Sequence, residues 1–100
     1  LPEVARINQG RMEIFLDGGF RRGSDIAKAL LLGASGVLIG RAGLYGLAAG
    51  KGPGAAHAIG ILRTELDRTL GLLGCSSLEE LTPDLIHAPH WRALAERIRA

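Results

Sequence analysis

The sequence has little cysteine, few aromatic residues and no long apolar run. Its single cysteine, Cys75, cannot form an internal disulfide, which favours a reducing, cytoplasmic compartment. No stretch approaches the roughly 20 apolar residues of a membrane-spanning helix, although peripheral attachment to an inner membrane stays open. Aromatic residues make up 4% of the chain, and this scarcity argues against a β-sandwich, in which aromatic and β-branched side chains abound.

An excess of charge of one sign is also missing. Twelve basic residues stand against ten acidic ones, for a formal net charge of +2, and the two signs alternate along the chain. A nucleic-acid-binding domain of this size would show a concentrated basic face, so we expect no nucleic-acid partner. Glycine, alanine and leucine are plentiful, and 47% of the residues are hydrophobic. That composition excludes a disordered chain and suits helices packed closely on strands.

Short apolar segments typical of strands alternate with helical segments in the first half of the chain. A short helix ends near Gly10, and brief apolar strands are predicted over residues 12–16 and 36–40. Between them lies a helix that Ser24 or Asp25 could cap at its start, with Gly33 as its C-cap. Short buried strands joined through a helix form parallel sheets. The sequence therefore predicts an α/β fold.

The second half is predicted to be helical. A small helix over 42–49 is followed by a glycine-rich surface connection, 50–54, and a long amphipathic helix over 55–73 that Gly74 ends. Ser77 and Glu80 have the spacing of a capping box. One more helix is expected over 89–100.

The residues with binding chemistry cluster immediately after the two strands. In parallel α/β folds this edge of the sheet binds ligands, and barrels often build a phosphate site from their last two strand–helix loops. Glycines let backbone N–H groups approach a phosphate, and arginine binds its oxygens in bidentate fashion. An aspartate suits a ligand that also carries hydroxyl groups. Spacing alone leaves open that these are ordinary tight turns with surface arginines. The residues concerned are Asp17, Gly18, Gly19, Phe20, Arg21, Gly40 and Arg41.

The run from Leu16 to Leu30 closely resembles the seventh strand–helix unit of the FMN-dependent α-hydroxy-acid oxidases and dehydrogenases, the (β/α)8 TIM barrels that include glycolate oxidase and the lactate and mandelate dehydrogenases. Residues 37–48 are similar to their eighth strand and the helix after it, and 65–78 to their final barrel helix. The resemblance implies a C-terminal portion of a TIM barrel over 1–86, incomplete on its own, with a helical tail over 87–100.

The resemblance also implies a cofactor, FMN, and roles for the loop residues. Asp17 would lie near the ribityl hydroxyls and Arg21 near the phosphate, with Gly18, Gly19 and Phe20 completing the first loop. The second loop would supply the Gly40 backbone and the Arg41 guanidinium. Arg22 is expected to form a surface or interface salt bridge. The parent protein would oxidise a small 2-hydroxy acid to the α-keto acid.

The family's catalytic histidine and its carboxylate-binding arginine are not found in this chain. His57, His87 and His90 do not stand in that motif. His87 and His90 are spaced as a possible metal-binding pair, but no third ligand is near them in the sequence. We therefore expect no catalytic residue, no metal and no activity from the 100 residues alone. The remainder of the barrel is the expected partner, and the full-length form is expected to be a homo-oligomer.

Two other interpretations stay open from the sequence. One is another phosphate-binding TIM barrel, since IMP dehydrogenase and type 2 isopentenyl-diphosphate isomerase carry similar glycine patterns. The other is a non-catalytic phosphate-binding module.

Overall fold

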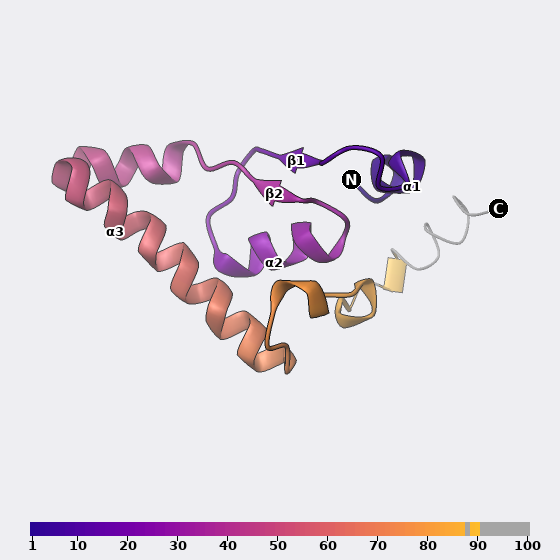
Figure 1. The fold of residues 1–100 in the computed structure, drawn as a ribbon. Helices are drawn as coiled ribbons and strands as arrows, with labels where there is room; N and C mark the ends of the chain where they lie inside the picture. Colours follow the sequence, from indigo (N-terminus) through magenta and orange to yellow (C-terminus); the bar gives the residue numbers. More distant parts are fainter. Residues whose placement is uncertain (88, 91–100) are drawn as a thin grey trace.

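The computed structural model describes residues 1–87, 89 and 90 as an α/β unit of two strands and three α-helices, with two short 3-10 turns. Figure 1 shows the two strands side by side, with one helix beside the pair and a long bent helix at one end. In chain order the elements are α1 (Pro2–Asn8), β1 (Phe15–Leu16), α2 (Gly23–Leu31), β2 (Gly36–Val37), α3 (Arg41–Leu73), η1 (Leu78–Glu80) and η2 (Pro83–Leu85).

The two strands form a parallel pair, which confirms the predicted arrangement. Phe15 lies opposite Gly36 and Leu16 opposite Val37. Both strands are shorter than the predicted ranges 12–16 and 36–40. In the first strand the reason is Asn8, whose side chain bonds both the N–H and the carbonyl of Met12 at 3.1 and 2.7 Å. These bonds hold the start of the segment in a turn instead of a ladder.

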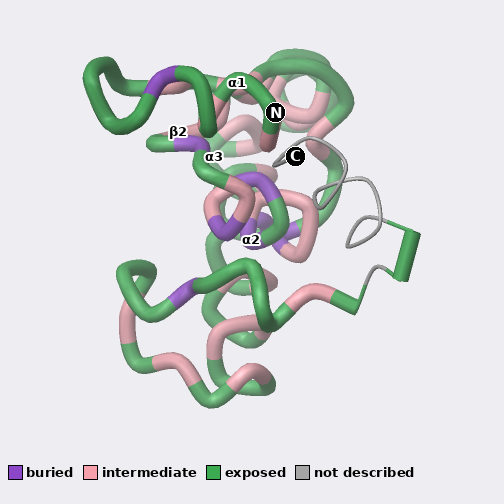
Figure 2. Tube along the Cα trace, turned by 90° about the vertical axis from the view of Figure 1, so that its right-hand side faces the viewer, coloured by how far each residue is buried: buried purple, intermediate pink, exposed green. Residues whose placement is uncertain are grey.

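Helix α2 carries half of the buried apolar residues of the described part of the chain. Ala27, Ala29 and Leu31 are buried in it, and Figure 2 shows buried stretches gathered there. Small alanines allow the helix to approach its neighbours closely, and it contacts both β2 and α3. The core of the described residues is therefore centred on α2.

The predicted caps of α2 were wrong by one to three positions. Neither Ser24 nor Asp25 is the N-cap, because the helix begins at Gly23 and Arg22 caps it. Asp25 instead occupies the third helical position, where its Oδ2 accepts the N–H of Arg22 at 3.2 Å. At the other end the cap is Leu32, and Gly33 follows with φ +109°. The glycine therefore lies one residue beyond the observed cap.

Helix α3 joins the two predicted helices across a kink. Gly50 and Lys51 have non-helical dihedrals, with φ +56° at Lys51, so the break falls within the predicted connection, but helix resumes before residue 55. The two arms lie close together near the bend. A Cβ on Gly46 would lie 2.5 Å from the carbonyl oxygen of Gly54, so the close approach depends on glycine.

The end of α3 agrees with its prediction. Gly74 is the C-cap, in the left-handed conformation at φ +74°. Ser77 does cap the next turn, but no side-chain cap bond forms. Glu80 bonds Ser76 instead, accepting its N–H and its hydroxyl at 2.7 and 2.8 Å. Most of the helix predicted over 89–100 lies outside the described residues. No helix within the described part is long and apolar enough to span a membrane.

Candidate functional site

Both strand–helix loops open onto one pocket. The first loop follows β1 and the second connects β2 to α3, and because the strands are parallel the loops meet at the same edge of the sheet. The open cavity between them has a volume of about 930 Å³. All seven residues singled out in the sequence line it: Asp17, Gly18, Gly19, Phe20, Arg21, Gly40 and Arg41.

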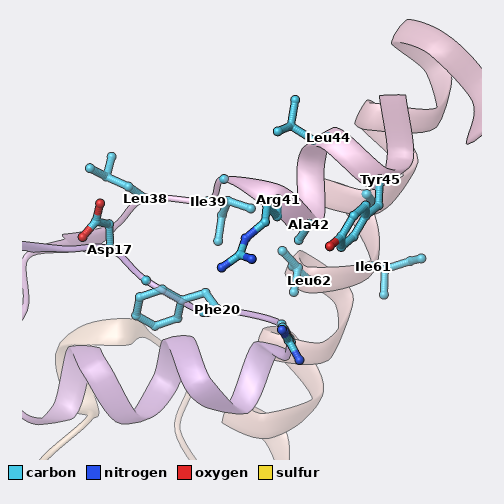
Figure 3. Close-up of a pocket in the computed structure, with 15 residues that line it drawn as sticks. Asp17, Phe20, Leu38, Ile39, Arg41, Ala42, Leu44, Tyr45, Ile61 and Leu62 are labelled. Carbon is cyan, nitrogen blue, oxygen red and sulfur yellow. The ribbon is translucent and has the colours of Figure 1, made fainter. Parts of the chain in front are cut away.

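The charged side chains of this pocket favour an anion. Asp17, Arg21 and Arg41 are the charged residues among those lining it, and together they carry a formal charge of +1. Figure 3 shows Arg41 extending from the start of α3 toward the loop that carries Phe20, while Asp17 lies on the other side, near Leu38. A ligand with a phosphate at the arginines and a hydroxyl at the aspartate would match this separation.

The glycines leave the backbone of both loops accessible. Gly18 and Gly19 have φ of +103° and +75°, conformations that side chains with a Cβ rarely adopt. A Cβ built on either of them, or on Gly40, would meet nothing within 4 Å. The space in front of these backbones is therefore open to a ligand.

The N-terminus of α2 is already occupied by two carboxylates. Glu65 of α3 accepts the N–H of Gly23 at 2.8 Å. Asp25 accepts the N–H groups of Arg21 and Arg22 at 3.4 and 3.2 Å. These acceptors neutralise the positive end of the helix dipole. An anion in the pocket would consequently find little free donor capacity at α2.

The N-terminus of α3 is different. It has no acidic residue in its first turn and no side-chain cap at Gly40. The N–H groups of Gly43 and Leu44 bond the Gly40 carbonyl at 3.1 and 3.2 Å. Within the described residues the N–H groups of Arg41 and Ala42 have no acceptor, as is usual for a first helical turn. This helix start combines unpaired donors with the Arg41 guanidinium, which suits a phosphate.

Sequence reasoning missed the apolar wall of the pocket. The kink of α3 brings its second arm back against the first, so that residues some twenty positions after the loops also line the cavity. The glycine-rich segment 50–54 was the signal, although it was interpreted as a surface connection. The additional lining residues are Leu38, Ile39, Ala42, Leu44, Tyr45, Ala58, Ile61 and Leu62.

The remaining candidates lie away from the pocket. Arg22 forms a salt bridge with Glu65, its Nη1 lying 3.1 Å from Oε1, as predicted for this residue. His57 and His87 are exposed and do not line the cavity. Among the described residues no group of three His, Cys, Asp or Glu side chains is placed to hold a metal ion.

Comparison with known proteins identifies related sequences over most of the chain. A family model described as FMN-dependent dehydrogenase matches residues 1–88. An L-lactate oxidase of a Nostoc species is 47% identical over 87 residues, which cover 87% of this chain and 24% of the relative. Glycolate oxidase 3 of Oryza sativa subsp. indica is 52% identical over 82 residues, 82% of this chain and 22% of the relative.

Solved structures agree with the sequence matches. The flavin-binding domain of baker's yeast flavocytochrome b2 superposes with a TM-score of 0.79 at 38% identity, covering 95% of this chain and 28% of that one. A soluble mutant of the membrane-associated (S)-mandelate dehydrogenase from Pseudomonas putida superposes with a TM-score of 0.76 at 46% identity. The match covers 82% of this chain and 24% of that one. The chain thus spans about a quarter of the length of the relatives it matches.

Proposed function

The chain belongs to the FMN-dependent dehydrogenase family, and on that premise we propose that it anchors the FMN phosphate of an oxidoreductase that converts an α-hydroxy acid to an α-keto acid. The observation that carries the proposal is the pocket shared by the two strand–helix loops. It is lined by two arginines, by the start of a helix with no acidic residue in its first turn, and by glycine backbones at one edge of the sheet.

The hydrogen-bonding groups of this pocket match those of a flavin mononucleotide in chemical type. A phosphate monoester carries close to two negative charges at neutral pH, which Arg21 and Arg41 would bind in charge-assisted hydrogen bonds. The N–H groups at the start of α3 would bind the same phosphate. Asp17 would accept hydrogen bonds from ribityl hydroxyls, and its carboxylate lies outside the cluster formed by Arg41 and its helix (Figure 3).

The other lining groups would shape the site. Gly18 and Gly19 would offer backbone N–H groups without a Cβ in front of them. Phe20, which is half-buried and lines the pocket, would complete the first loop. Leu38, Ile39 and Leu62 would exclude water from one side of the ligand, which strengthens the charged hydrogen bonds at the phosphate.

The chemical step belongs to FMN, which when bound accepts the two electrons removed from the carbon that bears the substrate hydroxyl. In this proposal no residue of the chain reacts. The arginines hold the cofactor in place, and proton removal and substrate binding are assigned to other parts of the protein. The chain alone is accordingly proposed to be inactive.

The finer fold assignment is part of the same proposal. We assign β1 and β2 to the seventh and eighth strands of a (β/α)8 barrel, with residues 1–86 in the barrel and 87–100 as a tail. Phe15 and Leu38 are 58% and 57% exposed, whereas parallel strands are normally buried on both faces. Neighbouring strands of the same barrel would cover them. A homo-oligomeric full-length form and a cytoplasmic location stay predictions.

The family match favours this function over the alternatives that the loops allowed. A phosphate-binding barrel of the IMP dehydrogenase or isopentenyl-diphosphate isomerase kind could share the glycine-rich first loop. The family model, however, matches through both loops and the whole of α3. This extent supports FMN as the ligand, in preference to a purine nucleotide or an isoprenoid diphosphate.

Removing one guanidinium from the full-length protein tests the proposal. Arg41→Ala should weaken FMN binding about 10- to 150-fold, because a hydrogen bond between charged groups is worth about 1.5–3 kcal/mol. Arg63→Ala, on the exposed surface of the same helix, is the matched control and should leave the affinity unchanged. Fluorescence quenching during FMN titration measures both. Undiminished FMN affinity in Arg41→Ala would show that the assignment is wrong.

A further inference from the structure

Glu65 links the phosphate loop to the far arm of α3. It lies 24 positions after the start of the helix, yet its carboxylate reaches the first residue of α2. Oε2 accepts the Gly23 N–H at 2.8 Å, and Oε1 accepts Arg22 Nη1 at 3.1 Å. Its side chain is 26% exposed, against 72% for Arg22. The bond to Gly23 is the better protected of the two, because water screens the exposed pair more strongly.

The contact is close as well as polar. A Cβ on Gly23 would lie 2.5 Å from the carbonyl carbon of Glu65 and would also strike the backbone nitrogen of Leu66. Only glycine lets the start of α2 lie this near the backbone of α3. The position of the chain immediately after Arg21 is therefore set by α3.

This linkage has two consequences for the pocket. First, it fixes the end of the loop that carries Arg21 against the same helix whose start carries Arg41. Second, the Glu65 carboxylate takes the Gly23 N–H that an anion would otherwise approach at the N-terminus of α2. The start of α3 is then left as the helix terminus with unpaired donors and no acidic neighbour.

We infer that Glu65 is a positioning residue for the phosphate site, which holds the Arg21 loop within reach of the α3 N-terminus and directs a phosphate monoester there. The inference rests on the proposed function, since it presupposes that the pocket binds the phosphate of FMN. Glu65 does not line the pocket and acts through Arg21 and its loop.

Comparison of FMN with riboflavin separates positioning of the phosphate site from general stability. Riboflavin has the same ring and ribityl chain without the phosphate. In the full-length protein, Glu65→Ala should raise the FMN dissociation constant about 10-fold, because fewer molecules hold the loop in its binding conformation. The riboflavin dissociation constant should change less than about twofold. Equal weakening of both ligands, or of neither, would overturn the inference.

Two further variants control the comparison. Glu65→Gln keeps an oxygen that can accept the Gly23 N–H but loses the ion pair, so its FMN affinity should fall only about threefold. If Glu65→Ala does not fold, the ratio of the FMN and riboflavin dissociation constants of Glu65→Gln tests the inference instead. A ratio equal to that of the wild type would refute the positioning role of Glu65. Asp67→Asn removes an exposed carboxylate from the same helix and should change neither affinity.

The ratio of the FMN and riboflavin dissociation constants of the wild type distinguishes failure of this inference from failure of the proposed function. If the wild type binds FMN and riboflavin equally well, the pocket does not anchor a phosphate, and both proposals fall. If the wild type prefers FMN strongly and Glu65→Ala keeps the full preference, the anchoring function stands and Glu65 has no positioning role. A preference for FMN that falls in Glu65→Ala, and falls further there than in Glu65→Gln, supports both.

Discussion

Gly23→Ala is the substitution that tests the packing of the site most severely. Gly23 begins α2 and is buried against α3. An added Cβ would lie 2.5 Å from the Glu65 carbonyl carbon and 2.6 Å from its Cβ, and closer still to the backbone of Leu66. Because these are backbone atoms and the first atom of a side chain, no rotamer change can make room. The start of α2 would have to move away from α3.

The cost can be estimated from the interactions that such a movement breaks. Overpacking of a well-packed contact costs about 1–3 kcal/mol. Movement away from α3 also lengthens the 2.8 Å bond from the Gly23 N–H to Glu65, and a bond to a charged acceptor contributes about 1.5–3 kcal/mol. Some relaxation will recover part of the sum, so we expect a loss of about 3–5 kcal/mol in the free energy of unfolding.

Urea unfolding of the full-length protein provides the measurement, with Gly60→Ala as the control. Gly60 also lies in α3, but a Cβ there would meet nothing within 4 Å. Alanine at that position should stabilise the protein by about 0.5–1 kcal/mol, since it favours the helix. Opposite signs for the two glycine-to-alanine changes are expected. A loss below about 0.5 kcal/mol for Gly23→Ala would refute the close contact between α2 and α3.

Two more predictions concern carboxylates. Asp17→Ala should weaken riboflavin binding about 10-fold through loss of a charged acceptor. FMN binding should weaken by less, because the removed charge also repelled the phosphate. Equal losses of affinity for the two ligands in parallel titrations would contradict this prediction. The hydrogen bonds from the backbone N–H and then from the hydroxyl of Ser76 lower the pKa of Glu80 below its ordinary 4.5. The Glu80 carboxylate should therefore stabilise the turn fully above pH 4.5, and this stabilisation should be lost as the pH falls through the lowered pKa of the folded protein. An NMR pH titration of the Ser76 amide should follow that loss. A titration midpoint at the ordinary pKa of 4.5 would contradict the hydrogen bond between Ser76 and Glu80.

The convergence of the two loops could be predicted from the sequence because it follows from topology. Two short apolar strands with a helix between them form a parallel pair, and parallel strands present their carboxyl ends at one edge. Asp17 and Arg41 could therefore be expected to line the same site before any coordinates were known. Gly74 was equally predictable, since a glycine after the last apolar position of a helix is a frequent left-handed cap.

The features that were missed depend on contacts between distant parts of the chain. Gly23 and Glu65 are 42 positions apart, and no local pattern indicates that they meet. The same contact explains why the N-cap of α2 is Arg22 and not the predicted Ser24 or Asp25. Because Glu65 accepts the N–H of Gly23, the helix can start at that residue. Local propensity identifies the glycines of segment 50–54 as breakers, but packing of the two arms decides that α3 bends there and continues.

A crystal structure of the full-length protein with FMN bound would test the central claim most directly. We predict that the phosphate lies between the guanidinium groups of Arg21 and Arg41, with N···O distances of about 2.7–2.9 Å, and accepts N–H groups from the start of α3. A phosphate bound elsewhere, or at the N-terminus of α2 in place of the Glu65 carboxylate, would contradict the account.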